Sequence, residues 1–359
     1  MRFLVVGENF KGAFGELIYN NLVRLGIETE KINTGDFFKL SFINRVLNKF
    51  LKVPHYFGCG VRKLNKIILE LASSGNFDFI LFLKPTFIYP KTIVEIKKYS
   101  KIIGLTMDHV DIFKTNSDYF YESIPSFDLY LVGRRDIGQS MYKLGAKKVY
   151  NFLMQADLIC HYPVKASKAE KEKFGVDIVF FGTYAKGEKR VEYLEKLCKE
   201  GYDVKIYGNS WDWYRLPWNS CLRKKNKIIR GGTPCEKMSK IISLSKIVLA
   251  FMRDAMGEVI ALRTSEIPLC EGFMLHQRTK EAEDFLIPDK EAVFFSDYKE
   301  MKEKIDFYLK HPELREKIAK AGYNKILNSG LLNYDMVKKL ISILKNKISD
   351  KDVLVTKPI

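Results

Sequence analysis

The sequence predicts an α/β protein of two lobes, each built around a mostly parallel sheet that helices cover. Short apolar segments alternate with amphipathic segments of helical spacing along the whole 359-residue chain, a pattern typical of strands joined by helices. Single hydrophobic cores stop growing at roughly 250–300 residues, so a chain of this length favours two lobes. The composition, 47% hydrophobic and 29% charged, is that of a globular protein.

The first lobe is expected to span residues 1–163. Short apolar runs predict its strands, and apolar residues that recur every three or four positions predict its helices. The expected strands cover residues 2–6, 77–83, 101–106, 127–132 and 148–152, and the expected helices cover residues 16–25 and 137–144.

The second lobe is expected to span residues 174–330. A polar, lysine-rich stretch that contains Pro163 lies between Ala156 and Gly175 and predicts the linker. The expected strands cover residues 178–181, 204–207, 247–251, 272–275 and 292–295, and the expected helices cover residues 189–200, 235–244, 298–309 and 312–327. A last helix, within residues 331–348, follows a break at Gly330.

The formal net charge of +17 predicts an anionic partner: a nucleic acid, an acidic lipid surface or a phosphorylated substrate. Neither a nucleic-acid-reading module nor a compact basic and aromatic patch accompanies this charge, so we expect no nucleic acid partner. No run approaches the ~18 consecutive apolar residues of a membrane-spanning helix. The N-terminus enters a strand pattern without the apolar core and cleavage site of a secretory signal, which predicts a cytoplasmic protein.

The six cysteines show neither a C-x-x-C pair nor the spacing of a zinc site. We interpret them as reduced packing residues.

A glycine-containing loop follows the first predicted strand. Gly7 and Gly12 have the spacing of a nucleotide-binding P-loop, but Ala13 and Phe14 stand where that loop needs Lys and Ser or Thr, which excludes it. Ligands of open α/β sheets bind at the carboxyl ends of strands. The loop with Gly12 and Ala13 is therefore either a ligand-contacting segment or only a tight turn.

Asp108, His109 and Asp111 follow the strand predicted at residues 101–106. Two interpretations are open, because these side chains can supply a general base or can cap a helix beside a solvated partner. The spacing of the two aspartates is one residue too long for an Asp-x-Asp metal motif. We therefore expect no metal site here.

In the second lobe, Gly182 and Thr183 end a predicted strand, and Arg190 lies at the start of the next predicted helix. Backbone N–H groups at a helix N-terminus, together with a guanidinium, favour the binding of a diphosphate. A glycine after a strand is also common in loops that bind no ligand.

The most specific pattern is Glu258-x7-Glu266, with Glu258 in a predicted loop and Glu266 in a predicted helix. Arg263 and Thr264 lie in the first turn of that helix, where N–H groups and a cation can hold phosphate. Glu266 can then accept hydrogen bonds from ribose hydroxyls. The alternative is a surface helix with an Arg263–Glu266 ion pair.

Several of these segments resemble the spore-maturation-protein-like branch of the GT-B glycosyltransferases. The resemblance is strongest between residues 127 and 327. Its segments are 263–266, 270–275, 291–295 and the pattern Leu309-x2-Pro312-x2-Arg315-x2-Ile318-Ala319-x2-Gly322, preceded by residues 128–131, 144–146, 149–153 and 180–183 with Arg190.

The resemblance implies the GT-B architecture, which is two Rossmann-like lobes with a cleft between them and a C-terminal helix that returns to the first lobe. It also implies a nucleotide-sugar donor on the second lobe, an acceptor on the first, and chemistry without a cofactor or a metal. The implied donor-binding residues are Gly182, Thr183, Arg190, Gly208, Arg230, Glu258, Arg263, Thr264 and Glu266. Gly12 and Ala13 become candidates for the acceptor side, and Asp108 and His109 become catalytic candidates.

The expected function is transfer of a sugar from a nucleotide-sugar donor to a glycan, a lipid-linked acceptor or a protein. If the anomeric configuration is inverted, Asp108 or His109 is the candidate base for the acceptor proton. The rivals are a non-catalytic carbohydrate- or nucleotide-binding protein on the same scaffold and a basic nucleic-acid-binding protein. The presence of Arg190, Arg263 and Glu266 favours the enzyme.

The segment 37–53 interleaves large apolar side chains with basic residues. On a helix, its apolar residues share one face. Either this helix packs on the first sheet, or it docks on an anionic membrane through Lys39, Arg45, Lys49 and Lys52. The second interpretation predicts a peripheral protein on the inner face of the membrane.

Overall fold

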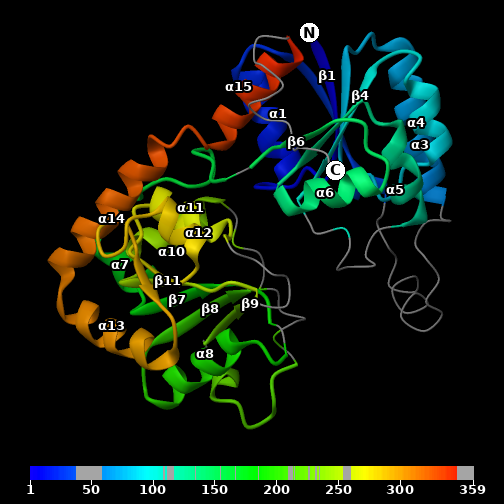
Figure 1. Cartoon of the computed structure of the whole chain (residues 1–359). Coiled ribbons are helices and arrows are strands. Elements are labelled where there is room, and N and C mark those ends of the chain that lie inside the picture. The colour runs from blue at the N-terminus through cyan, green and yellow to red at the C-terminus, as the bar shows by residue number, and fades with distance from the viewer. Residues whose placement is uncertain are drawn as a thin grey trace. The chain divides into compact units, whose positions relative to one another are not determined.

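The computed structural model describes residues 1–37, 59–107, 110, 117–133, 135–153, 155–165, 167–184, 186–208, 213, 215–224, 227–230, 233, 235–253 and 260–345. The chain forms two compact units (Figure 1). The first unit comprises residues 1–154 and 333–359, and the second comprises residues 155–332. Each unit contains one six-stranded parallel sheet with helices on its faces, so the predicted two-lobed α/β fold is confirmed.

The sheet of the first unit has the strand order β2-β1-β3-β4-β5-β6. Its strands are β1 (Arg2–Gly7), β2 (Glu28–Asn33), β3 (Phe79–Leu83), β4 (Lys101–Thr106), β5 (Leu129–Val132) and β6 (Val149–Asn151). The helices are α1 (Phe14–Arg24), α3 (Cys59–Ser74), α4 (Pro90–Ile96), α5 (Asp118–Ser123), α6 (Arg135–Lys143) and α15 (Asn333–Leu344), with short 3-10 turns at Thr34–Phe37 and Ile124–Ser126.

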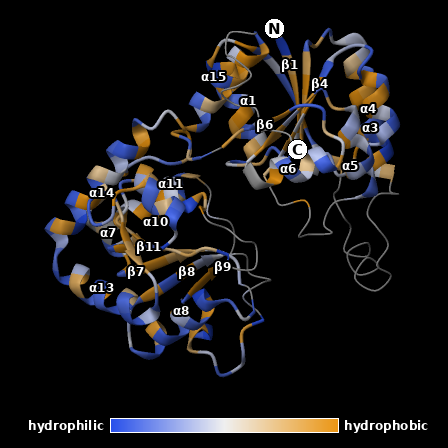
Figure 2. Cartoon of the chain, viewed as in Figure 1, coloured by the Kyte–Doolittle hydropathy of each residue, from blue (hydrophilic) through white to orange (hydrophobic). Residues whose placement is uncertain are grey.

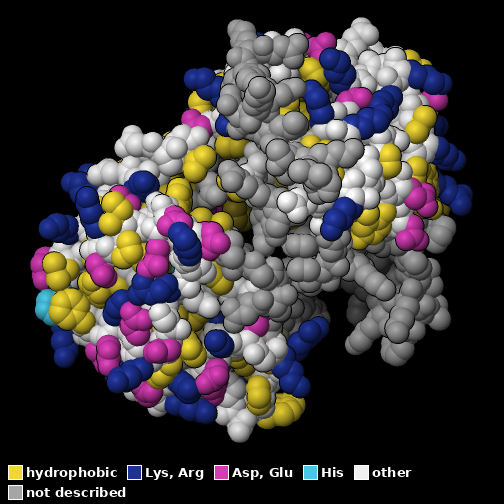
Figure 3. All heavy atoms as spheres, viewed as in Figure 1, with side chains coloured by type: hydrophobic (Ala, Val, Ile, Leu, Met, Phe, Trp, Pro, Cys, Tyr) yellow, Lys and Arg dark blue, Asp and Glu magenta, His cyan; other side chains and the backbone are white. Residues whose placement is uncertain are grey.

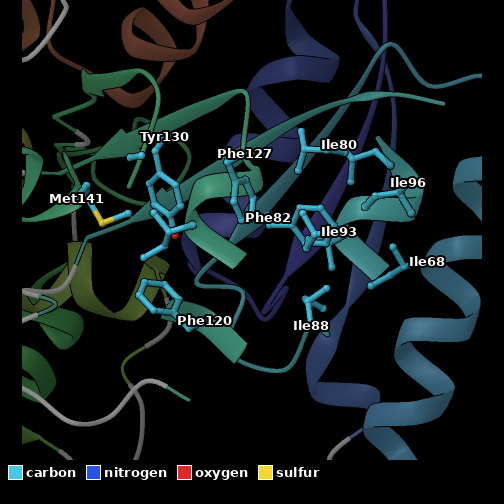
Figure 4. Close-up of a cluster of buried hydrophobic side chains, with 14 of the residues drawn as sticks. Ile68, Ile80, Phe82, Ile88, Ile93, Ile96, Phe120, Phe127, Tyr130 and Met141 are labelled. Atoms are coloured by element: carbon cyan, nitrogen blue, oxygen red, sulfur yellow. The ribbon is translucent and has the colours of Figure 1, made fainter. Parts of the chain in front are cut away.

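The core of the first unit lies between the sheet and the helices α3 to α6. Ile80 and Phe82 project from β3 and meet residues such as Ile68 of α3 and Ile93 of α4 (Figure 4). Alternate strand residues point to the opposite face of the sheet. There α1 packs beside α15, on the side of the sheet away from α3 and α4 (Figure 1).

The sheet of the second unit has the strand order β12-β11-β10-β7-β8-β9. Its strands are β7 (Ile178–Phe181), β8 (Val204–Gly208), β9 (Ile228–Arg230), β10 (Ile247–Ala250), β11 (Met274–Gln277) and β12 (Val293–Phe295). The helices are α7 (Lys168–Phe174), α8 (Lys189–Lys199), α10 (Cys235–Leu244), α11 (Arg263–Leu269), α12 (Lys280–Phe285), α13 (Tyr298–Lys310) and α14 (Pro312–Leu327), with a 3-10 turn at Cys221–Arg223.

Two hydrophobic clusters cover the two faces of this second sheet. Phe180 belongs to the cluster that includes residues of α8 and α13, and the next residue, Phe181, belongs to the cluster that includes residues of α10 and α11. Because successive strand residues point to opposite faces, one buried strand anchors both helical layers. The strands are correspondingly apolar, while the helices carry hydrophilic residues on their outer sides (Figure 2).

The segment between the predicted lobes is ordered within the second unit. Residues 155–163, predicted to lie in the first lobe, lie in this unit, and the lysine-rich stretch after them forms α7. Glu170 of α7 forms an ion pair with Lys240 of α10 at 2.8 Å. The lysine-rich composition therefore marks a solvated helix.

Cys160 and Cys235 form a disulfide bond. The prediction that all six cysteines are reduced is wrong for this pair, because the fold brings together two residues that are 75 positions apart. Cys59, Cys198, Cys221 and Cys270 are free thiols.

In the parts of the chain that the structure describes, no helix has the length and apolarity needed to cross a membrane. The candidate membrane-docking segment 37–53 lies outside the described residues except for Phe37, which packs against the first core. Lys and Arg side chains are mixed with Asp and Glu over the visible surface of the second unit (Figure 3).

Replacement of Gly104 by Ala tests the packing of the first core. Gly104 lies in β4, and a Cβ atom there would overlap the ring of Tyr130, which is fully buried and has no space to move away. We expect Gly104→Ala to lower the free energy of unfolding by about 1–3 kcal/mol, measured by urea denaturation. The double variant Gly104→Ala, Tyr130→Leu should recover part of this loss. Equal stability of Gly104→Ala and wild type would contradict the packing described.

Candidate functional site

In each sheet, the chain first adds strands on one side of its first strand and then adds the remaining strands on the other side. The position where the side changes is a topological switch point. These switch points lie between β1 and β3 in the first sheet and between β7 and β10 in the second. Loops leave a switch point in opposite directions, so the carboxyl ends of its two strands border a crevice suited to ligands. Most of the predicted site residues that the structure describes lie close to these two edges.

A cavity of about 610 Å³ opens at the switch point of the first sheet. Gly12 and Ala13 of the predicted loop line it, together with Phe10, whose side chain is exposed, and Met107, which follows β4. Most of the other lining residues are apolar, and the charged ones are Glu8 and Lys84. The cavity can therefore take a group with apolar surface and a few polar atoms.

The catalytic candidates Asp108 and His109 lie outside the described residues, and so does Asp111. They follow directly in the sequence after Met107, which lines the cavity. Their role as a base stays a prediction.

At the edge of the second sheet, Gly182 follows β7 and Gly208 ends the neighbouring strand β8, and the two glycines approach each other closely. A Cβ atom on Gly208 would overlap the carbonyl oxygen of Gly182, which accepts a hydrogen bond of 3.0 Å from the indole of Trp213. Arg230 is paired with Gly208 in the strand register. Gly182, Gly208 and Arg230 thus belong to one edge, and Thr183 is half-buried beside them.

Arg263 and Glu266 of α11 lie on the face of this sheet that carries Phe181. The guanidinium of Arg263 is 5.7 Å from the centroid of the Phe181 ring, and it forms an ion pair with Oε2 of Glu266. The side chain of Glu266 is 10% exposed, and that of Arg263 is 31% exposed. A buried carboxylate needs bonding partners. Glu266 therefore differs from the exposed carboxylate of the surface ion pair that the sequence also allowed.

His161 is the second partner of Glu266. Its Nε2 atom lies 3.5 Å from Oε1 of Glu266, and its side chain is 7% exposed. The sequence analysis missed this residue, because a single histidine beside a predicted linker carries no pattern. The fold alone brings it to the carboxylate.

Arg190 lies on the opposite face of the second sheet. Its guanidinium is 6.0 Å from the centroid of the Phe180 ring and 2.5 Å from Oε2 of Glu188, and both charged residues are buried. The described contacts therefore associate Arg190 with the start of α8, whereas Arg263 packs on Phe181. None of these contacts joins Arg190 to Arg263, although the resemblance assigns both arginines to donor binding.

Thr264 is fully buried, and its hydroxyl bonds to Nε2 of His276 at 2.9 Å. Its backbone N–H donates to the carbonyl of Ala261, and the next two N–H groups donate to that of Leu262. The first-turn N–H groups that the sequence suggested for phosphate are thus used within the turn. Glu258 lies outside the described residues.

Among the described residues, no group of three or more His, Cys, Asp or Glu side chains is arranged to hold a metal ion. The expectation of a metal-independent reaction stays a prediction, because the described contacts do not test it.

The two buried histidines of the second unit are neutral near pH 7. Burial and the positive charge of Arg263 lower the pKa of His161 to about 3, although hydrogen bonding to the backbone of Asp157 acts in the opposite direction. Burial lowers the pKa of His276 to about 4. His161 therefore meets Glu266 as a neutral imidazole and not as a cation.

These pKa values predict that acid weakens the second unit. Between pH 6.5 and 5, unfolded histidines bind protons that the buried ones do not, so the free energy of unfolding falls as pH falls. We expect a loss that approaches about 1.4 kcal/mol per pH unit for each histidine toward pH 5, where the unfolded histidine is almost fully protonated, measured by urea unfolding. Tryptophan fluorescence reports on this unit, because Trp211, Trp213 and Trp218 all lie in it.

In the variant His276→Gln, the slope with pH should fall by about half. Glu170 and Glu300, whose pKa values are lowered to about 2, contribute only in more acidic solution. A free energy of unfolding that does not change between pH 6.5 and 5 would show that the histidines are not buried as described.

Comparison with known proteins finds a family match within the second half of the chain. Residues 189–337 match the family described as glycosyl transferase-like. This region contains Arg190, Gly208, Arg263, Thr264 and Glu266. No curated protein sequence matches the chain.

Solved structures resemble almost the whole chain. A glycosyltransferase from Rickettsia africae has a TM-score of 0.62 and 14% identity, with 96% of this chain and 98% of that chain covered. An alpha-glucosyltransferase in complex with UDP-glucose and DNA containing an abasic site has a TM-score of 0.67 and 15% identity, with coverage of 96% and 99%. Anabaena HepE in complex with UDP-glucose has a TM-score of 0.60 and 10% identity, with coverage of 96% and 100%.

These matches confirm the resemblance to GT-B glycosyltransferases and do not support the narrower spore-maturation-protein-like branch. The chain therefore has the GT-B fold, and its residues 189–337 are similar to the glycosyl transferase-like family.

Proposed function

We propose that this protein is a glycosyltransferase that moves a sugar from a nucleotide-sugar donor to a glycan, a lipid-linked acceptor or a protein. The observation that carries the proposal is the ion pair of the partly exposed Arg263 with the buried Glu266 beside the carboxyl end of β7, within the region that matches the family. A buried carboxylate beside a partly exposed guanidinium fits a ligand that combines hydroxyl groups with phosphates.

The proposed donor is a uridine diphosphate sugar. Two of the related structures hold UDP-glucose, which supports this choice of nucleotide. Glu266 accepts hydrogen bonds from the ribose hydroxyls, and Arg263 meets the phosphates. Gly182, Thr183, Gly208, Arg230 and Arg190 stay candidates for the rest of the donor site, and so does Glu258.

The proposed acceptor binds at the cavity of the first unit, with the loop of Gly12 and Ala13 at its wall. A hydroxyl of the acceptor attacks the anomeric carbon while the bond from that carbon to the diphosphate breaks. If the configuration is inverted, Asp108 or His109 takes the hydroxyl proton. Both residues directly follow a wall residue of the cavity in the sequence, which supports them as candidates.

The transition state gathers negative charge on the leaving diphosphate while positive charge develops on the sugar. Guanidinium groups can offset the first charge in the absence of a metal. Arg263 is the first candidate, because its side chain is the more exposed member of the buried pair.

Replacement of Glu266 and Arg263 tests the donor site. We expect Glu266→Gln to weaken UDP binding by about tenfold or more, because a charged acceptor of two hydroxyls becomes neutral. Arg263→Ala should weaken UDP about as much but leave uridine nearly unaffected, since only UDP carries phosphates. Isothermal titration calorimetry measures both, with Glu192→Gln on the exposed face of α8 as the matched control. Unchanged UDP affinity in the double variant would exclude this donor site.

Chelation tests whether the sugar transfer depends on a metal ion. We expect sugar transfer, or hydrolysis of UDP-glucose, to proceed at an unchanged rate in excess EDTA, because the diphosphate charge is met by side chains. The assay follows UDP release with and without EDTA. Loss of activity on chelation, with recovery on addition of manganese, would overturn metal independence.

A further inference from the structure

We propose that His161 is a positioning residue, which fixes the carboxylate of Glu266 for recognition of the ribose of the donor nucleotide. The inference rests on the proposed donor site and goes further, because it assigns a role to a residue outside α11 and outside the family match, which begins at residue 189. The observations that carry it are the tautomer of the imidazole, its burial, and the bonds that hold its loop.

The hydrogen bonds of His161 define which ring nitrogen carries the proton. The backbone N–H of Asp157 donates to Nδ1 of His161 at 3.1 Å, so Nδ1 is an acceptor and carries no proton. The proton of a neutral imidazole then lies on Nε2. Nε2 is the atom that faces Oε1 of Glu266 at 3.5 Å, and its N–H can therefore donate to the carboxylate.

Glu266 is held from two sides. Arg263 contacts Oε2, while His161 faces Oε1. With the side chains of Glu266 and His161 only 10% and 7% exposed, water competes little for these contacts. A carboxylate oriented in this way keeps a fixed direction for its remaining lone pairs, and the recognition of two vicinal hydroxyls requires such a fixed direction.

The neutral state of His161 is part of this arrangement. Because its pKa lies far below 7, the imidazole faces Glu266 without adding a positive charge. A second cation beside Glu266 would form a tight ion pair with it and would compete with ribose. A neutral donor orients the carboxylate and leaves it able to accept further bonds.

The loop that carries His161 is fixed to the body of the second unit. The backbone N–H groups of Cys160 and His161 both donate to the carbonyl of Asp157, at 2.9 and 2.7 Å. The disulfide joins Cys160 to Cys235 at the start of α10, and the hydroxyl of Ser239 donates to the carbonyl of Cys160 at 2.6 Å. The imidazole is thus held from α10, while the carboxylate belongs to α11.

The test compares ribose with a sugar that lacks both hydroxyls. Calorimetry gives the affinities of each protein for UDP and for 2′,3′-dideoxyuridine diphosphate, and the ratio of the two measures ribose recognition. If part of a variant is unfolded, its apparent affinities for the two nucleotides fall by the same factor, so their ratio does not change. The variants are His161→Phe, which keeps a ring without the donor, and His161→Gln, which keeps an N–H donor. Glu266→Gln, the double variant with His161→Phe, and the half-buried control His311→Phe complete the set.

We expect wild type to prefer UDP by about tenfold or more, and Glu266→Gln to lose most of this preference. His161→Phe should lose a similar part, His161→Gln should regain much of it, and the double variant should be no worse than Glu266→Gln alone. His311→Phe should behave as wild type.

The outcomes separate the inference from the function on which it rests. If Glu266→Gln loses the preference and His161→Phe keeps it, His161 is only a packing residue and the donor site stands. If His161→Phe weakens both nucleotides by the same factor, its role is structural and the inference is overturned. If wild type binds the two nucleotides equally, Glu266 does not recognise ribose and the proposed donor site itself fails.

Discussion

The parallel direction of every strand is the constraint on which both units depend. In a parallel sheet all carboxyl ends lie at one edge, so loops that are distant in sequence start from neighbouring positions. Gly182 after β7, Gly208 at the end of β8 and Arg253 after β10 become neighbours along one edge for this reason. Where two strand ends approach closely at this edge, only small residues fit. The same edge brings polar side chains from different loops close together.

Burial on both faces of the second sheet then decides which side chains meet. Phe180 and Phe181 point to opposite helical layers, and each has an arginine beside it: Arg190 on one face and Arg263 on the other. Arg190 and Arg263 look equivalent in sequence, because both are arginines at helix starts. Their surroundings in the structure nevertheless differ. Arg190 is enclosed with Glu188, while Arg263 shares Glu266 with His161 and stays partly exposed. Of the two arginines, Arg263 is the one whose side chain is partly exposed.

The sequence predicted most of the strands and several helices, and it missed others, among them the helices α3 to α5, which supply buried residues to the first core. The predicted bounds of β7, α10 and α14 agree with the structure, because each has a continuous apolar run or a clear helical period. The edge strand β2 (Glu28–Asn33) was missed, since its exposed residues are mostly charged or polar. Helix α7 was taken for a linker for the same reason. The Cys160–Cys235 bond and the approach of His161 to Glu266 depend on contacts between distant segments, and no local pattern encodes these.

A site for a diphosphate needs more positive charge than the pair of Arg263 and Glu266 supplies. Arg263 and Glu266 cancel each other, and His161 is neutral, so the three side chains together carry no net charge near pH 7. A diphosphate brings at least two negative charges, which must be met by further cations or by dipoles. Arg253 follows β10 at the switch point of the sheet, and Arg230 ends β9 on the same edge. Salt screens exposed charges that are more than about 8–10 Å apart, so the net charge of +17 can act on such a ligand mainly through residues close to this edge.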